Sequence, residues 1–384
     1  MAAEMIIVNA REEPPDGWDA AVFLAGPAPR SPEVPSWRPA AHAELRERWR
    51  GGRLVVFDPE DRKEVLFDYA GQVDWEERCL NLADEVLFYV PRDLETMPAF
   101  TTNVEWGIWH DSGRVVFGAP PGAPKNRYLL HYAEKFGVPT ATDLPGTVAA
   151  TLDRIGSGAA RTGGECEVPL LLWRTAAFQS WYGAQRAAGN ALLGARVVWR
   201  FGDQWGLRVR IRVAAEDRIK DDEMVISRPD LGVVVLYRPG PTLDATTVVL
   251  VREFRGPAAT PDGRVHEPPG GSGPAGGADP LRAALAELAE ETGLALPADR
   301  LREHGSRQVN ATMSAHRAHV FAAEITEDEL AALSSGGPHG VAADGERTYV
   351  EIATFGEIRR ERLVDWAALG MIAEVLTESG IGEG

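Results

Sequence analysis

The sequence predicts a protein of two domains: a doubly wound α/β domain with a parallel sheet in the first half, and an α+β domain in the second. Three observations predict this. Short apolar runs alternate with helix-like stretches between residues 20 and 150. Strand-rich sequence surrounds one long helix-like stretch after residue 195. The 384 residues are sufficient for two hydrophobic cores.

The first half contains four apolar runs rich in valine and phenylalanine, at 20–26, 53–58, 85–90 and 114–118. Such runs are typical of strands buried on both faces. The helix-like stretches that follow them are 38–50, 74–84, 102–113 and 125–137. This alternation predicts a parallel sheet, and ligands of such sheets bind beyond the carboxyl ends of the strands.

A stretch of small residues at 156–165 is typical of a flexible linker, and the aromatic stretch after it predicts a connecting helix. We therefore expect one domain at 1–155, a linker and connecting helix at 156–194, and a second domain at 195–384. Within the second domain, the sequence predicts strands at 197–219, 230–239, 246–256, 318–325 and 347–354, and helices at 279–292 and 363–379.

Composition excludes several functional classes. A net charge of −17 argues against binding a nucleic acid polymer, which requires a basic face, although it permits a small anionic substrate. The sequence has no apolar run long enough to cross a membrane and no signal peptide at its start. Its two cysteines, Cys79 and Cys166, lie far apart, so we expect reduced thiols in a cytoplasmic protein.

Three glutamates, Glu287, Glu290 and Glu291, are spaced i, i+3 and i+4 in the predicted helix at 279–292. This spacing places three carboxylates on one helix face, where they repel one another unless a cation lies between them. Hard oxygen ligands suit Mg²⁺ or Mn²⁺. The glycine-rich loop before the helix, with Gly270 and Gly271, gives a diphosphate close access to the backbone. The alternative is a solvated acidic face.

The segment 266–296, HEPPGGSGPAGGADPLRAALAELAEETGLAL, resembles the Nudix box. The resemblance implies an α/β/α Nudix fold and metal-dependent hydrolysis of a nucleoside diphosphate linked to another group. It implies Glu267 as a further metal ligand and Glu346 as general base, with Glu351 as second choice. Three positions depart from the box: Ser272 stands where its opening glycine is expected, with Gly271 beside it, Ala278 replaces its first glutamate and Ala286 its arginine. These departures put the full catalytic rate in doubt.

The first half resembles the nucleoside 2-deoxyribosyltransferase family, on the strings VFLAGPAPR (22–30), DYAGQVDWEERCLNLADEVLFYVPR (68–92) and TTNVEWGIWHDSGRVVFG (101–118). The resemblance implies a flavodoxin-like sheet. It implies Glu105 as the nucleophile that attacks C1′ of a nucleoside, with Glu76 as the second carboxylate. It also implies a homo-oligomer, because enzymes of this family share sites between subunits. The expected substrate-binding residues are Phe23, Gly26, Pro27 and Asn103.

Together these observations predict a bifunctional enzyme that acts on small nucleosides or nucleotides. One domain is expected to cleave or transfer an N-glycosidic bond, and the other to cleave a diphosphate. The alternative is a nucleotide sensor in which the first domain binds without turnover and the second is weak or inactive. We expect a sensor to gain thermal stability from its ligand without forming product.

Overall fold

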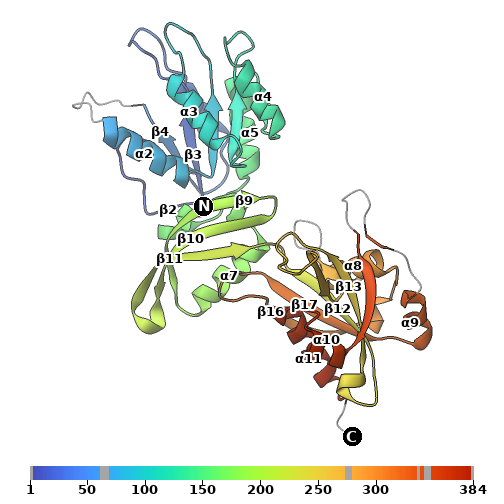
Figure 1. Ribbon diagram of the computed structural model, residues 1–384. Helices are drawn as coiled ribbons and strands as arrows, with labels where there is room; N and C mark the ends of the chain where they lie inside the picture. Colours follow the sequence, from blue (N-terminus) through green and yellow to red (C-terminus); the bar gives the residue numbers. More distant parts are fainter. Residues whose placement is uncertain (1–2, 61–68, 273–278, 335–337, 341–346, 382–384) are drawn as a thin grey trace. The chain divides into compact units, whose positions relative to one another are not determined.

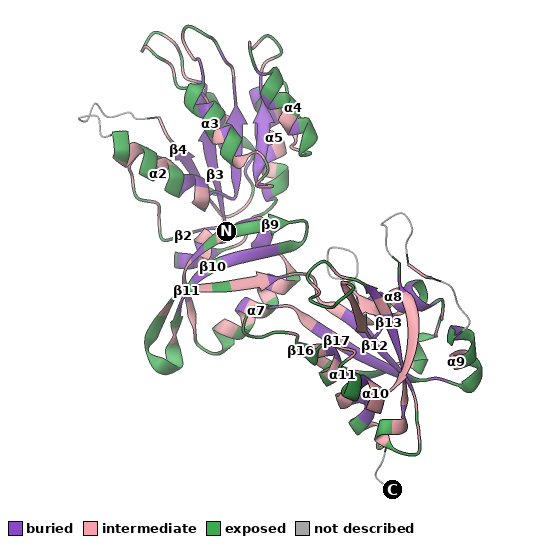
Figure 2. Ribbon diagram, viewed as in Figure 1, coloured by how far each residue is buried: buried purple, intermediate pink, exposed green. Residues whose placement is uncertain are grey.

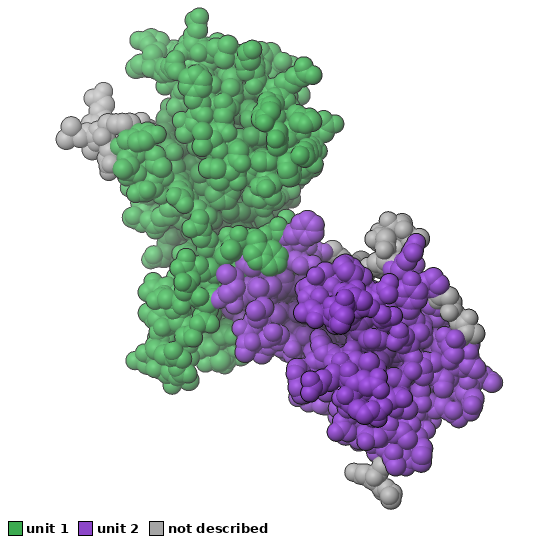
Figure 3. Space-filling view, viewed as in Figure 1, with its two compact units in different colours: residues 1–175, 184–200, 207–223 green, residues 176–183, 201–206, 224–384 purple. Residues whose placement is uncertain are grey.

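The computed structural model describes residues 3–60, 69–272, 279–334, 338–340 and 347–381. The chain divides into two compact units (Figure 3). Unit 1 consists of Met1–Thr175, Ala184–Arg200 and Leu207–Glu223; unit 2 consists of Ala176–Gly183, Phe201–Gly206 and Met224–Gly384.

Unit 1 is built on a six-stranded sheet in the order β1-β4-β3-β5-β6-β7, and all its pairings are parallel (Figure 1). The parallel sheet predicted from the apolar runs is therefore confirmed. The central strands are buried along almost their whole length, as Figure 2 shows. The strands are β1 (Glu4–Asn9), β3 (Ala20–Ala25), β4 (Arg53–Asp58), β5 (Glu85–Tyr89), β6 (Val115–Gly118) and β7 (Thr140–Ala141).

Helices cover both faces of this sheet and complete two cores. One core contains side chains of α2 (Tyr69–Leu82), α3 (Phe100–Trp109) and α4 (Arg127–Lys135), including Trp75, Trp106 and Leu129. The other contains side chains of α1 (Arg38–Arg48) and α5 (Leu144–Ile155). Figure 1 shows α2, α3 and α4 on the same side of the strands. Two helices therefore lie on one face and three on the other.

Without the edge strand β1, the strand order of this sheet is second-first-third-fourth-fifth. This is the flavodoxin-like order, and its switch point lies between β3 and β5, where ligands typically bind beyond the carboxyl ends. The loops at that point begin at Gly26 and at Val90. A ligand site is therefore expected at these loops and at the helices α2 and α3 on the neighbouring face.

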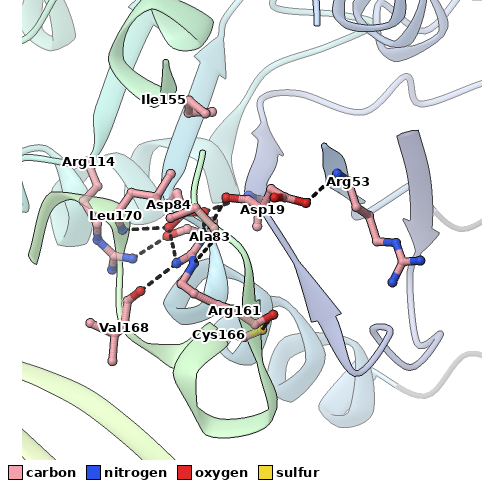
Figure 4. A network of polar contacts seen from close by, with 12 residues as sticks. Asp19, Arg53, Ala83, Asp84, Arg114, Ile155, Arg161, Cys166, Val168 and Leu170 are labelled. Atoms are coloured by element: carbon pink, nitrogen blue, oxygen red, sulfur yellow. Dashed lines mark hydrogen bonds and ion pairs between the residues drawn. The ribbon is translucent and has the colours of Figure 1, made fainter. Parts of the chain in front are cut away.

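The segment that we expected to be a flexible linker, 156–165, instead packs into unit 1. It forms β8 (Arg161–Thr162), which pairs with β2 (Gly17–Trp18), and the start of the 3-10 helix η1 (Gly163–Glu167). Arg161 is 1% exposed and forms an ion pair with Asp84 (Figure 4). A short helix, α6 (Leu170–Trp173), follows and also contributes buried leucines to the unit. The small residues of this segment allow close packing. Composition alone does not distinguish close packing from flexibility, and the prediction of a flexible linker was therefore wrong.

A helix, α7 (Ala176–Ala187), and a three-stranded sheet in the order β11-β10-β9 follow. The single strand region predicted at 197–219 is a hairpin, because Gly202 adopts φ +55° in the turn between its strands. Phe178 of α7 packs against Trp205, with ring centroids 6.2 Å apart. The strands are β9 (Ala191–Phe201), β10 (Gln204–Val213) and β11 (Arg218–Ser227), with the 3-10 helix η2 (Ala214–Glu216) between the last two.

Unit 2 is built on a mixed seven-stranded sheet in the order β14-β13-β12-β17-β16, with β15 paired to β12 and β18 paired to β13. β12 and β17 are parallel, and the other pairings are antiparallel. The strands are β12 (Leu231–Arg238), β13 (Thr247–Phe254), β14 (Arg264–Glu267), β15 (Gly270–Gly271), β16 (Arg302–Gln308), β17 (Arg317–Glu324) and β18 (Tyr349–Thr354).

Helices lie on both faces of this second sheet. Ala284 and Leu288 of α8 pack against one face, and Ile358 and Ile372, of α10 and α11, pack against the other. The layers are therefore helix, sheet and helix. Four α-helices follow β12 in the chain: α8 (Pro280–Thr292), α9 (Glu327–Ser334), α10 (Phe355–Glu361) and α11 (Trp366–Glu378). Two 3-10 helices, η3 (Leu243–Ala245) and η4 (Ala298–Arg300), also follow it.

Candidate active site

A groove of about 950 Å³ runs between α2 and α3 in unit 1. Glu76 of α2 and Glu105 of α3 both line it. Much of the rest of its wall is apolar and exposed, since Tyr69, Phe100 and Ile108 are 63–67% exposed. A groove with apolar walls and a few convergent polar groups is the usual form of a small-molecule site.

The pKa of Glu105 is raised to about 7, by burial first and then by the nearby charge of Glu76. Arg38 opposes this shift without cancelling it. Glu105 is the sixth residue of α3. It lies beyond the first turn, so the helix dipole contributes little to keeping this carboxylate ionised. Near neutral pH, Glu105 exists in both protonation states.

Glu76 accepts a hydrogen bond from Gln72 Nε2 at 2.7 Å. Burial raises its pKa, and the hydrogen bond from Gln72 and the charge of Arg38 oppose that rise. Two carboxyl groups that interact in this way titrate as a pair rather than separately. The charge of Glu76 thus acts directly on the ionisation of Glu105 in this groove.

Arg38, the first residue of α1, supplies the cation beside these acids and is 2% exposed. Its Nη2 donates to the carbonyl oxygen of Gly26 at 2.8 Å, and its Nε lies 3.4 Å from Asp58 Oδ1. One buried guanidinium therefore holds the loop after β3, and its charge opposes the rise in the pKa of both glutamates. Sequence reasoning missed Arg38, because arginine at a helix start is ordinarily exposed. The proline that follows it marks only the helix start.

Residues 19–123 match the family model described as "Nucleoside 2-deoxyribosyltransferase like". This segment is a nucleoside 2-deoxyribosyltransferase-like domain. The match agrees with the parallel sheet and covers both glutamates of the groove. No Nudix family model matches the chain, and no curated protein matches it. In the described ranges, no helix has the length and hydropathy that a membrane span requires.

Two substrate-binding residues predicted for the deoxyribosyltransferase-like domain lie elsewhere. Phe23 is fully buried in the core, with its ring centroid 6.4 Å from that of Trp75, so it does not shape a pocket. Its place in the middle of β3 is the reason, because both faces of that strand are covered. Asn103 accepts a hydrogen bond from Arg92 at 2.6 Å and lines a different cavity, between α3 and α4.

Gly26 and Pro27 end β3 at the switch point. A side chain at Gly26 is excluded, because φ is +154° and a Cβ atom would lie 2.2 Å from the carbonyl oxygen of Tyr89. The carbonyl oxygen of Pro27 accepts from Trp37 Nε1 at 3.1 Å. These two residues therefore set the course of the loop, and Arg38 links the loop to the carboxyl pair.

In unit 2, Glu287 and Glu291 of α8 face the short strand β15. Gly270 N donates to Glu291 Oε2 at 2.9 Å, and a Cβ atom at Gly271 would lie 2.5 Å from the carboxyl carbon of Glu287. The pKa of Glu291 is raised to about 8, by burial first and then by the charges of Glu287 and Glu253. The glycines therefore leave space that two carboxyl groups occupy.

The structure does not bring all of the other predicted metal ligands to Glu287 and Glu291. Glu267 lies 3.3 Å from Arg255 Nη2, and the charge of Arg255 also acts on Glu291. Glu290 is exposed. Within the described ranges, no group of three His, Cys, Asp or Glu residues has an arrangement that could hold a metal ion. Glu253, a buried residue of β13, is a nearby acid that sequence reasoning missed, because it lies far from α8 in the sequence and outside the segment 266–296.

Of the two candidates for general base, Glu346 lies outside the described residues. Glu351, the second choice, lies on β18. It is 2.7 Å from His266 Nε2 and 3.5 Å from Arg252 Nη1. His266 and Arg252 are thus the groups that position this carboxylate.

Proposed function

We propose that the deoxyribosyltransferase-like domain cleaves or transfers the N-glycosidic bond of a nucleoside or nucleotide at the groove between α2 and α3. The observation that carries the proposal is the electrostatic pairing of Glu76 and Glu105 in one groove. The family match over 19–123 supports the nucleoside as substrate class. The apolar walls of the groove suit a planar base.

The proposed reaction has two displacements. The ionised carboxylate of Glu105 attacks C1′, the bond between C1′ and the base nitrogen breaks, and Glu76 in its protonated form donates a proton to the departing base. Water or a second base then attacks C1′ of the glycosyl ester and releases Glu105, while Glu76 takes the proton of that nucleophile. Two inversions give net retention at C1′. The electrostatic coupling of the two acids favours a state in which one is ionised and attacks while the other is protonated and donates.

The test is a chromatographic assay for free base, with a panel of nucleosides and nucleotides. Glu105→Gln and Glu76→Gln each remove one charge at similar volume, and each should reduce base release by roughly 10²-fold or more. Glu47→Gln, at an exposed position of α1, is the control and should retain the wild-type rate. Ligand-induced thermal stabilisation with no base released from any member of the panel would support the sensor instead.

A trapping experiment identifies the nucleophile. A 2-fluoro-2-deoxy nucleoside slows the second displacement, so an adduct should accumulate on Glu105 and be located by mass spectrometry of a digest. An adduct on Glu76 would exchange the two roles. Base release without any adduct would favour direct attack by water.

We also propose that unit 2 hydrolyses a nucleoside diphosphate linked to another group, with Mg²⁺ or Mn²⁺. Of the four ligands predicted from the sequence, Glu287 and Glu291 are the two that lie against Gly270 and Gly271, and they would hold the ion. Glu290 is exposed and Glu267 pairs with Arg255, so these two would have to move to join them. Support comes from the acids themselves: the charges of Glu287 and Glu253 add to the burial that raises the pKa of Glu291, and a cation would relieve that repulsion. When bound, such an ion neutralises charge on the diphosphate and activates water.

The residues of unit 2 have their own roles in this proposal. The backbone of Gly270 and Gly271 gives the diphosphate close approach, and Gly270 N orients Glu291. Glu346 is the proposed general base. The test is a chromatographic screen of nucleoside diphosphate derivatives with Mg²⁺ and with excess EDTA, in which cleavage should require the ion.

We propose, finally, that the protein is a homo-oligomer. Tyr69, Phe100, Val104 and Ile108 are exposed apolar side chains on α2 and α3, at the rim of the groove. Exposed apolar clusters of this kind commonly mark subunit contacts. Light scattering after size-exclusion chromatography measures the mass directly, and a species of 41.6 kDa alone would contradict the proposal.

A further inference from the structure

A second cavity, of about 390 Å³, lies between α3 and α4 in unit 1. The residues of α3 divide between the two cavities: Val104, Glu105 and Ile108 line the groove described above, whereas Asn103, Trp106 and Gly107 line this one. The second cavity is therefore on the other side of α3 from the carboxyl pair. Its volume is within the range of small-molecule sites.

Arg92 is the most unusual residue of this cavity. It is 7% exposed, and its Nη2 donates to Asn103 Oδ1 at 2.6 Å, but its Nε has no hydrogen-bond partner. Within the described ranges, no acidic side chain pairs with it, and burial is the cause that lowers its pKa. A buried cation without a counter-charge is strongly unfavourable, so such groups are normally paired. An anion bound in the cavity would supply the missing charge.

A second cation lines the same cavity. Lys125, which is exposed and adopts φ +60°, contributes its ammonium group to the lining. Arg92 and Lys125 therefore bring two positive charges to one cavity. A ligand that pairs with both carries acceptor oxygens and a negative charge.

The remaining walls are aromatic. Tyr128, Tyr132 and His110 line the cavity, with ring centroids 5.1 Å apart for the tyrosines and 5.0 Å apart for His110 and Tyr132. Tyr128 is 70% exposed, which leaves its ring free to stack on a planar group. The cavity is thus lined by cationic side chains and by aromatic rings.

We propose that the cavity between α3 and α4 is a separate binding site for the phosphate of a nucleoside 5′-monophosphate, held by Arg92 and Lys125, with the base on Tyr128. The site does not depend on the proposed glycosidic activity, because none of these residues lines the groove between α2 and α3. Phosphate oxygens accept from the guanidinium and the ammonium group, and the base packs on the tyrosine ring.

The test uses calorimetric titration with AMP, adenosine and inorganic phosphate. AMP should bind to one saturable site of this kind, phosphate should compete with it, and adenosine should bind at least about tenfold more weakly, the scale of a lost charge-assisted contact. Adenosine that binds as tightly as AMP would overturn the proposal, as would the absence of saturable binding of AMP and phosphate.

Gly107 offers a way to close the cavity without removing a polar group. A Cβ atom at Gly107 meets nothing within 4 Å, so Gly107→Phe should extend into the cavity and abolish AMP binding, whereas Gly107→Ala should retain it. Glu47→Gln, at an exposed position of α1 that lines neither cavity, should leave AMP binding unchanged. AMP binding to Gly107→Phe as tight as to Gly107→Ala would overturn the assignment, and so would its loss in Glu47→Gln.

A variant at an exposed residue provides a second test in case Gly107→Phe does not fold. Lys125→Glu reverses an exposed charge at the cavity and should weaken AMP roughly tenfold or more, while adenosine binding changes little. Unchanged AMP affinity in this variant, together with wild-type affinity in an Arg92→Met variant, would exclude the cavity as the phosphate site.

Discussion

Arg161 and Asp84, 77 positions apart in the chain, form a bidentate ion pair in the interior of unit 1, with Nη1–Oδ1 at 2.8 Å and Nη2–Oδ2 at 2.6 Å. Asp84 also accepts from the backbone N–H groups of Ala21 and Leu170, each at 2.8 Å. Arg161 donates to the carbonyl oxygen of Val168 at 2.7 Å. One pair thus joins β3, the start of β5 and the segment after α5.

We predict that breaking this pair destabilises unit 1 strongly. Asp84→Asn leaves the Arg161 guanidinium buried without its counter-charge, which should reduce the free energy of unfolding by about 3–5 kcal/mol. Urea denaturation followed by fluorescence measures the change. Glu13→Gln, which breaks the exposed pair with Arg78, is the control and should leave the midpoint nearly unchanged. Equal effects of the two substitutions would contradict the role of the buried pair.

We predict that the pH profile of base release has an acidic limb near pH 7, where the rate rises as Glu105 ionises, and a fall at higher pH where Glu76 loses its proton. The pKa of Glu105 is raised to about 7, and a nucleophilic carboxylate must be ionised. Glu76→Gln removes one cause of that shift, so the acidic limb of its residual activity should move to lower pH. The measurement is kcat/KM as a function of pH for both proteins. A rate that falls through pH 7 would assign Glu105 the proton-donor role.

The free energy of unfolding should also depend on the ionisation of Glu105. The pKa of Glu105 is about 7 in the folded protein, above its ordinary value of 4.5, so proton binding favours the folded state. This contribution is complete below about pH 4.5 and is lost as the pH rises through about 7. Glu105→Gln should therefore raise Tm by a few degrees at pH 8, and the difference should disappear near pH 5. A lower Tm at pH 8 would show that the carboxylate is stabilising there.

A fourth prediction concerns the loop after β3. Gly26→Ala introduces a Cβ atom 2.2 Å from the carbonyl oxygen of Tyr89, at a φ that L residues rarely adopt. The loop must move, and the contact between Gly26 O and Arg38 moves with it. Tm should fall and base release should drop. Gly107→Ala, in an open helical position, is the matched control and should preserve both.

The last prediction concerns unit 2. Glu291→Gln should reduce cleavage of a nucleoside diphosphate derivative by roughly 10²-fold, because it removes one charge from the proposed ion site. Glu324→Gln, at an exposed position at the end of β17, is the control. Retention of the wild-type rate in Glu291→Gln, or in excess EDTA, would count against a metal-dependent reaction in this unit.

Local patterns in the sequence determined the secondary structure and the parallel sheet of unit 1. The run Arg53–Asp58 is both the predicted strand and β4, and Ala20–Ala25 lies within the predicted 20–26. Strands buried on both faces must be continuously apolar, and this requirement is visible without knowing their neighbours. The strings around Glu76 and Glu105 likewise identified the family that the model at 19–123 matches. The resemblance of unit 2 to Nudix hydrolases remains a proposal.

Tertiary structure alone decided which side chains meet. Nothing near Arg161 in the sequence indicates Asp84 as its partner, and the small residues around it read as a linker because composition records size and polarity, not contacts. Arg38 beside Glu105, and Arg92 beside Trp106, bring together residues from different elements. Burial and charge, which set the pKa of Glu105, act through space over a few ångströms, and the chain order of those residues carries no record of that distance.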